Sequence, residues 1–198
     1  LDTGGFDAKY KLLILLAHSF GYIAKPDDLL NIGINNIGGL ELKYAREKGL
    51  KIKLVAQAFK NPDGSISAFV LPKFVDSEDR LFNVDDVFNG VITKTSFADE
   101  QFFVGKGAGA HPTASAVLSD ISALSYDYQY EYKKIAQQED LILSDDVNLK
   151  VFLRHNVEDA VNLKKHFLNI DESYLNNESG YLTGTISLEN LRTIHFDE

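Results

Sequence analysis

The spacing of apolar and polar residues divides the first hundred residues into two helices and several extended runs. Residues 6–21 form an expected helix that is apolar nearly all round after Lys11 and ends at Gly21, so this helix is predicted to be buried. Residues 40–48 place apolar side chains at helical spacing between charges and end at Gly49, as a half-buried helix does. Extended runs follow at residues 51–59, 66–71, 91–95 and 101–104.

The turn chemistry joins the first two runs into a hairpin. Asn61-Pro-Asp-Gly64 favours a tight turn, because proline presets one backbone dihedral and glycine accepts a positive φ. Pro72 is expected to end the pairing. About four strands with flanking helices predict an α+β fold, a domain built on a mixed sheet.

The pattern changes after residue 125. Residues 148–198 predict strand, helix, strand, strand and a helix start at Glu189, the order of a small ferredoxin-like module. The strands are expected at residues 149–153, 170–175 and 180–188, and the helix at residues 157–167. We expect domains at 1–125 and 148–198 and a connector at 126–147, whose alternate tyrosines are Tyr126, Tyr128, Tyr130 and Tyr132.

Composition and charge narrow the class of protein. The chain has 198 residues, 44% of them hydrophobic and 25% charged, as in a folded globular protein. The net charge of -9 without a basic stripe argues against nucleic acid or an anionic membrane as a partner. The charge is -2 over residues 1–125 and -7 over 126–198, which supports the boundary. With no cysteine, a thiol nucleophile is excluded, and no apolar run is long enough to span a bilayer.

Two stretches carry candidate chemistry. Asp7 and Lys11 lie four residues apart on one helix face, with Asp2 just upstream on the Gly4–Gly5 turn. Taken alone, such a pair is most often an ordinary surface ion pair. Residues 105–109, Gly-Lys-Gly-Ala-Gly, precede a helix expected from Pro112 to about Leu124. The structural alternative there is a tight strand-to-helix corner, and the spacing is not that of a dinucleotide-binding fingerprint.

Together these stretches resemble two signatures of homoserine dehydrogenases. The first is D-x-x-G-x-D-x-x-x-K, filled by Asp2, Gly5, Asp7 and Lys11, with Thr3 where the family usually has an aliphatic residue. The second is the glycine loop followed by Pro-Thr-Ala-Ser-Ala-Val at residues 112–117. The resemblance covers residues 1–125 well and the remainder weakly.

The resemblance implies a reversible hydride transfer that interconverts L-homoserine and L-aspartate 4-semialdehyde with NAD(P)(H), in threonine and methionine biosynthesis in the cytoplasm. Lys11 is then expected to move the hydroxyl proton, Asp7 to orient Lys11 and the substrate, and Asp2 to pair with the substrate ammonium. Gly105, Gly107, Ala108 and Gly109 are expected to approach the nicotinamide. The choice between NAD and NADP stays open.

The resemblance also implies missing and additional parts. No dinucleotide-binding βαβ unit is visible and the chain opens inside a signature, so we expect a fragment that is inactive without an upstream nucleotide-binding domain. A homodimer through the sheet is expected. The tail resembles an ACT-like regulatory module, but residues 154–158 replace its usual Asp-Arg-Pro-Gly turn, so it either binds an amino-acid effector or only packs.

Other functions remain open on the sequence. One alternative is a non-catalytic module for dimerisation or amino-acid sensing, favoured if Asp7 and Lys11 point away from the glycine loop. Another is a different nicotinamide-dependent oxidoreductase on the same scaffold. The five histidines show no spacing typical of metal ligands, so no metal site is assigned.

Overall fold

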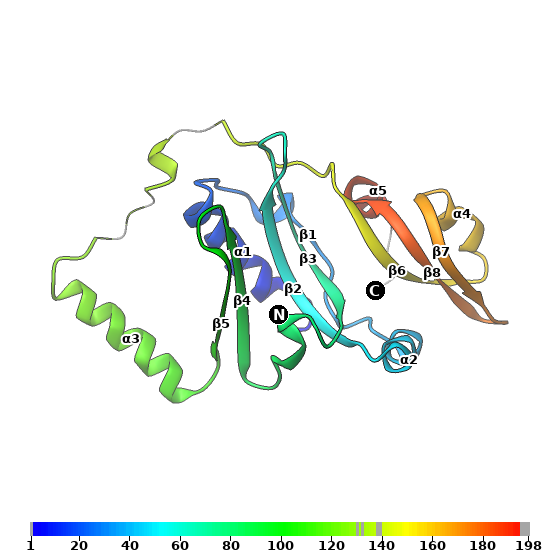
Figure 1. Cartoon of the computed structure of the whole chain (residues 1–198), viewed down its shortest axis with the longest axis horizontal. Coiled ribbons are helices and arrows are strands. Elements are labelled where there is room, and N and C mark those ends of the chain that lie inside the picture. Colours follow the sequence, from blue (N-terminus) through cyan, green and yellow to red (C-terminus); the bar gives the residue numbers. More distant parts are fainter. Residues whose placement is uncertain (1, 130, 132, 138–139, 195–198) are drawn as a thin grey trace.

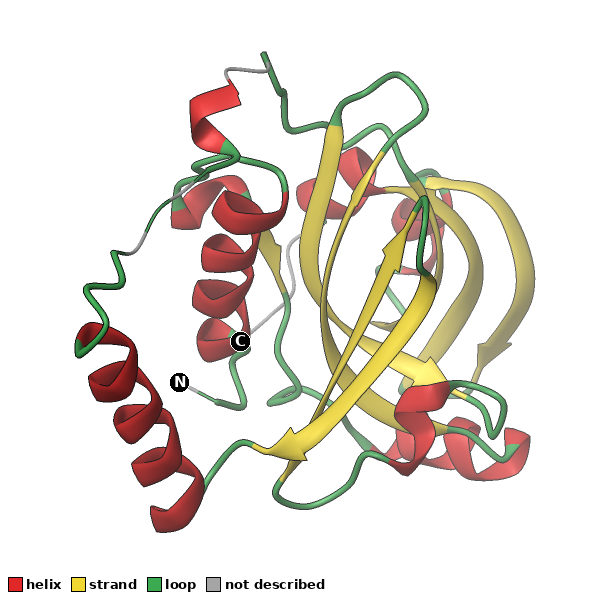
Figure 2. Ribbon diagram, turned by 60° about the vertical axis from the view of Figure 1, so that its left-hand side comes forward, coloured by secondary structure: helices red, strands yellow, loops and turns green. Residues whose placement is uncertain are grey.

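The computed structural model describes residues 2–129, 131, 133–137 and 140–194 as three small sheets and their helices (Figures 1 and 2). The helices are α1 (Phe6–Ser19), α2 (Gly39–Lys48), α3 (Ala110–Leu124), α4 (Ala160–Lys164) and α5 (Leu188–Thr193). The strands are β1 (Leu30–Asn31), β2 (Lys51–Lys60), β3 (Ile66–Val75), β4 (Phe88–Thr95), β5 (Asp99–Lys106), β6 (Asn148–Asn156), β7 (Phe167–Leu175) and β8 (Ser179–Ser187). The α+β class and the mixed sheet are confirmed.

The central sheet has the order β1-β3-β2, with β1 parallel and β2 antiparallel to β3. The predicted hairpin is confirmed, with Gly64 at φ 91° in its turn. The prediction that Pro72 ends the pairing is wrong, because Pro72 lies opposite Leu54 within the ladder. On the side of β3 away from β2, the paired residues of β1 lie opposite Phe69 and Val70, so β1 does not reach Pro72. At Pro72 that side of β3 is a free edge among the described strands, where the N–H that proline lacks would have had no strand to bond to.

Two apolar clusters lie on opposite faces of β3. On one face Leu12 and Leu16 of α1 pack against Ile66, Ala68 and Val70. On the other face Phe69 belongs to a cluster with Leu153 and Ile186 of the C-terminal sheet and with Leu188 and Leu191 of α5. Successive side chains of β3 point to opposite faces of the sheet, so they enter the two clusters in turn. Because both faces are covered, the first half of β3 is buried throughout.

α1 is buried on one face only, which corrects the expectation of a fully buried helix. Leu16 is fully buried, whereas Ile14 is 54% and Leu15 48% exposed. Phe6, Tyr10 and Ile14 lie on the exposed face, four residues apart. Apolar composition alone did not reveal that the described chain covers only the face turned to β3.

β4 and β5 form a separate two-stranded ribbon that leads into α3. In Figure 1, α3 stands away from the sheets, at the left of the molecule. None of the described residues of α3 is buried. Even its apolar residues Leu118, Ile121 and Leu124 are more than half exposed. An apolar helix of 15 residues without a buried face is the kind of surface that another protein part covers.

The C-terminal sheet has the order β6-β8-β7, with both pairings antiparallel. The expected helix at 157–167 is reduced to α4, five residues long. Phe167 instead starts β7 opposite Ile186 and joins the apolar cluster, while Val161 is 72% exposed. Burial of Phe167 in the sheet thus overrides helix propensity at this end.

The segment just before β6 belongs to the central sheet as much as to a connector. Ile66 pairs with Leu143 in a parallel bridge, flanked by hydrogen bonds from Ile66 N to Ile142 O and from Ser144 N to Ile66 O, 2.8 Å each. The Ser67 hydroxyl donates to Ser144 O at 2.7 Å. Tyr130 and Tyr132 lie outside the described residues.

Candidate functional site

The signature residues lie on a tight turn that starts α1. Gly5 adopts φ 75°, a conformation that side chains disfavour, and its N–H donates to Asp2 O at 3.0 Å. The glycine required by the signature is thereby explained by backbone geometry. Asp2 is exposed on this turn.

The turn rests on residues 31–34, which comprise the end of β1 and the start of the next loop and which were not predicted to belong to the site. Ile34 N–H donates to Thr3 O at 2.7 Å, and Asn31 Nδ2 donates to Gly4 O at 2.8 Å. A Cβ atom at Gly33 would lie 2.2 Å from Thr3 O. A glycine within an apolar run signals such a close backbone approach, so the run 32–34 did contain a clue.

Asp7 and Lys11 form an exposed ion pair. Lys11 Nζ donates to Asp7 Oδ2 at 2.7 Å, and the two side chains are 62% and 51% exposed respectively. The pair lies beside the uncovered apolar residues Phe6 and Tyr10. The described chain thus presents the pair at the start of a helix face that nothing else in it covers.

The glycine loop, residues 105–109, begins in the last two residues of β5, and its three glycines differ in their surroundings. A Cβ atom at Gly107 would lie 1.9 Å from Asn89 Nδ2, so Gly107 is held close against β4. Gly109 adopts φ 120° at the start of α3, which only glycine does easily. Gly105 has nothing within 4 Å of a Cβ position. The loop therefore exposes backbone that an outside group can approach.

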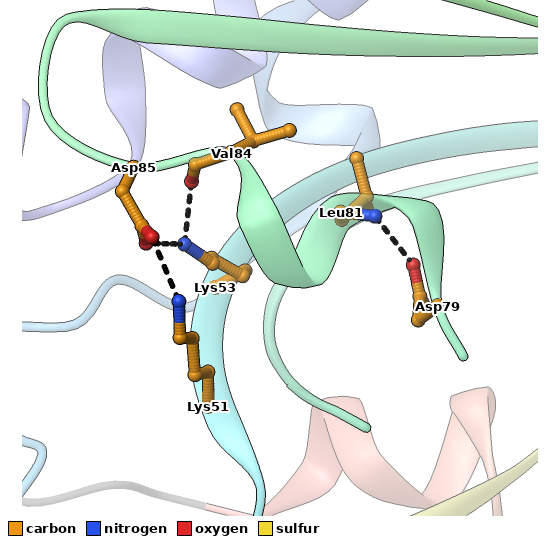
Figure 3. Close-up of polar contacts among 6 residues, drawn as sticks. All are labelled: Lys51, Lys53, Asp79, Leu81, Val84 and Asp85. Carbon is orange, nitrogen blue, oxygen red and sulfur yellow. Dashed lines mark hydrogen bonds and ion pairs between the residues drawn. The ribbon is translucent and has the colours of Figure 1, made fainter. Parts of the chain in front are cut away.

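A charged anchor fixes the segment just before β4, the strand that pairs with β5. Lys51 and Lys53 of β2 reach Asp85 at 2.7 and 2.6 Å, and Lys53 also donates to Val84 O (Figure 3). The hydrogen bonds from Lys51 and then Lys53 lower the pKa of Asp85 to about 2. Phe88 N–H donates to Asp85 O, and Gly107 N–H donates to Val87 O at 3.0 Å. The anchor thus positions the glycine loop through the start of β4.

The two signature segments lie at the same end of the molecule. In Figure 1 the start of α1 and the end of β5 both lie on the side of the central sheet away from the C-terminal sheet. A cavity of about 1520 Å³ lies elsewhere, between β2–β3 and the C-terminal sheet, and Asp2, Asp7 and Lys11 do not line it. The candidate site is therefore an open surface in this chain.

In the part of the chain that the structure describes, no group of three or more His, Asp or Glu residues is placed to hold a metal ion. His195 lies outside that part. None of the described helices has the length and apolar character needed to cross a bilayer.

Known proteins resemble this chain over one region in sequence and over nearly all of it in structure. The family model described as homoserine dehydrogenase matches residues 1–122. Homoserine dehydrogenase of Helicobacter pylori is 41% identical over 120 residues, which is 61% of this chain and 28% of that relative. The crystal structure of a homoserine dehydrogenase from Thiobacillus denitrificans superposes with a TM-score of 0.76 at 25% identity, over 96% of this chain and 48% of the other.

A hyperthermophilic archaeal homoserine dehydrogenase in complex with NADPH superposes with a TM-score of 0.50 at 28% identity, over 65% of this chain and 35% of the other. The chain spans about 28% of the length of the Helicobacter relative, so it corresponds to part of such a protein. The structural match to the Thiobacillus protein extends beyond residue 122, so the C-terminal sheet also has a counterpart there.

Proposed function

Because the chain belongs to the homoserine dehydrogenase family, we propose that it forms the substrate-binding and catalytic part of an enzyme that interconverts L-homoserine and L-aspartate 4-semialdehyde with NAD(P)(H). The observation that carries this proposal is the Lys11–Asp7 ion pair in the first turns of α1, at two positions of the signature. Lys11 and Asp7 are proposed as the catalytic pair, and Asp2 as the group that binds the substrate ammonium.

The residues divide the work of aldehyde reduction between them. The Lys11 ammonium would donate a proton to the aldehyde oxygen as the alcohol forms, and in the reverse direction the amine would accept the hydroxyl proton. Asp7, which accepts the hydrogen bond from Lys11, would hold that nitrogen in place. The Asp2 carboxylate would fix the amino-acid end of the substrate by charge.

The proposed contact with the cofactor is the exposed end of β5 and the glycine loop that continues it. Residues Gly105, Gly107, Ala108 and Gly109 are exposed, and the open space at Gly105 lets a planar ring come close to the backbone. We assign these residues to contact the nicotinamide end, with the rest of NAD(P) bound outside this chain. When bound, NAD(P)H supplies the hydride.

The test uses the natural polypeptide that carries this chain. Lys11→Ala is expected to lower the rate of homoserine oxidation by roughly 10²–10⁴-fold, because proton transfer by a positioned side chain is worth that much. The matched control is Lys43→Ala, which removes the Lys43–Glu47 pair, also four residues apart on a helix. Equal, small losses in both variants would show that Lys11 is a surface residue and favour the non-catalytic module.

A homodimer through the β4–β5 ribbon is the second part of the proposal. Val91 and Phe103 lie opposite each other in the ribbon and are 45% and 56% exposed. A two-stranded ribbon with an uncovered apolar face gains stability from a covering surface. Phe103→Asp is therefore expected to shift the molar mass measured by light scattering toward the monomer, while Lys94→Asp on the same strand pair leaves it unchanged.

A further inference from the structure

The C-terminal sheet docks on the central sheet through an aromatic cluster. Tyr44 of α2 lies 5.0 Å from Phe152 of β6, ring centroid to centroid, and Phe152 stacks on Tyr181 of β8 at 4.6 Å. Phe74 of β3 completes the cluster, 5.5 Å from Tyr44. These rings place β6 beside α2.

Arg154 lies two residues beyond Phe152, on the same face of β6, and crosses the start of α2. Its Nε lies 3.2 Å from Glu41 Oε1, and its Nη2 donates to Asn36 O at 2.8 Å. Glu41 is only 7% exposed, and its other oxygen accepts from Gly38 N–H at 2.9 Å. One guanidinium therefore joins the helix cap and the preceding loop, in a geometry that lysine cannot reproduce in full.

That loop is the one on which the signature turn rests. Asn36 O lies two residues from Ile34, whose N–H donates to Thr3 O, and Ile37 N–H donates back to Ile34 O at 3.3 Å. The close fit of Gly33 against Thr3 and Gly4 leaves the loop and the turn little room to move separately. Contacts thus run without a gap from Arg154 through residues 33–37 to the turn that carries Asp2.

We propose that Arg154 is a positioning residue, through which the C-terminal sheet holds the Asp2–Gly5 turn in its substrate-binding geometry. Without Arg154, the Glu41 carboxylate stays buried with the Gly38 amide as its hydrogen-bond donor, so the loop at 33–37 is expected to rearrange. The catalytic readout of this inference rests on the function proposed above, whereas the structural readout does not.

The structural test is hydrogen exchange on the natural polypeptide that carries this chain. Arg154→Ala is expected to speed exchange of the Ile34 and Gly5 amides about tenfold and to leave the β4–β5 amides unchanged. Lys150→Ala is the control, because Lys150 lies on the same strand and its ion pair with Asp171, at 3.8 Å, is exposed. Arg154→Lys, which keeps the charge, is expected to lie between the two.

The kinetic test separates positioning from loss of fold. Arg154→Ala is expected to raise the KM for homoserine roughly tenfold, with the KM for the cofactor and kcat changed less than about twofold. Glu41→Gln, which retains an acceptor for Gly38 N–H, is expected to shift the same KM in the same direction.

Unchanged Ile34 exchange, or exchange raised equally across the whole chain, overturns the inference. If the wild-type polypeptide turns over no homoserine, the proposed function fails, and the exchange result alone decides the role of Arg154.

Discussion

Gly5 and Gly33 show how single residues shape the candidate site. Gly5 provides the positive φ that starts α1, and its Cβ position would lie 2.7 Å from Asn31 Oδ1. Gly33 has its own close contact with Thr3 O. The two glycines let the signature turn and the loop after β1 share one small space.

Gly33→Ala should therefore destabilise the protein by about 1–3 kcal/mol, the usual cost of forcing atoms into a packed site, and weaken homoserine binding. Gly39→Ala is the matched control, since nothing lies within 4 Å of a Cβ there and its φ is not positive. Thermal unfolding of both variants checks this. A Gly33→Ala protein as stable as Gly39→Ala would contradict the close packing of the two segments.

The free energy of unfolding should depend on pH through Asp85, because Lys51 and Lys53 lower the pKa of its carboxyl group. Its pKa falls from about 3.9 in the unfolded chain to about 2 in the folded one, so the anchor stabilises the fold above about pH 4. This stabilisation is lost as the pH falls through 4 toward 2. We expect the difference in stability between wild type and Asp85→Asn to be constant from pH 5 to 7, to shrink as the pH falls below about 4, and to vanish only below about pH 2. Urea unfolding across that range measures it, with Asp86→Asn as the control.

The residues that support the site were harder to predict than those that form it. Asp7 and Lys11 are four residues apart, so helix geometry alone pairs them. Asn31 meets Gly4 across 27 residues and Arg154 meets Asn36 across 118, and no local pattern encodes such contacts. The same holds for Lys53 and Asp85, which are 32 residues apart.

At the scale of elements, the ends of α1 and α2 were predictable, whereas the extent of the β2–β3 pairing and of α4 was not. Gly21 and Gly49 end α1 and α2 in the left-handed conformation that their residue type favours. Pro72 was misjudged because its tolerance depends on where β1 stops, and α4 was overestimated because Phe167 is recruited by β8. The residue types near a glycine cap determine where such a helix ends, whereas the extent of a strand depends on the strands that pair with it.

Burial separates two leucines that look alike in the sequence. Leu16 of α1 is fully buried and Leu118 of α3 is 65% exposed. In the chain of residues 1–198, Leu16→Ala should cost about 2–5 kcal/mol of unfolding free energy, and Leu118→Ala less than about 0.5 kcal/mol. Denaturant titration of both variants checks this. A large loss for Leu118→Ala would mean that α3 packs on this chain.

At the scale of the whole molecule, the two main sheets are joined by more than a linker. Residues 142–144 add to the edge of β3, Arg192 Nη2 donates to Asp28 O at 2.7 Å, and Lys48 pairs with Glu172 at 2.7 Å. Division of the chain at residue 125 therefore removes part of the central sheet.

A chain of residues 1–125 should exchange the Ile66 amide roughly 2- to 10-fold faster than a chain of residues 1–147, because only the longer one retains the Ile142 acceptor. Both chains lack the C-terminal sheet, so a difference in exchange between them comes from residues 126–147. Equal exchange at Ile66 would show that the bridge to Leu143 contributes nothing to the sheet.

The bridge between Ile66 and Leu143 also determines when the central sheet can be completed during synthesis on the ribosome. β3 is synthesised long before residues 142–144, and at about 5–20 residues per second the interval is roughly 4–15 s. Throughout that time the start of β3 presents unpaired backbone groups, as an exposed edge that other nascent chains can pair with. The central sheet is therefore completed late in synthesis, by a segment that emerges only after α3.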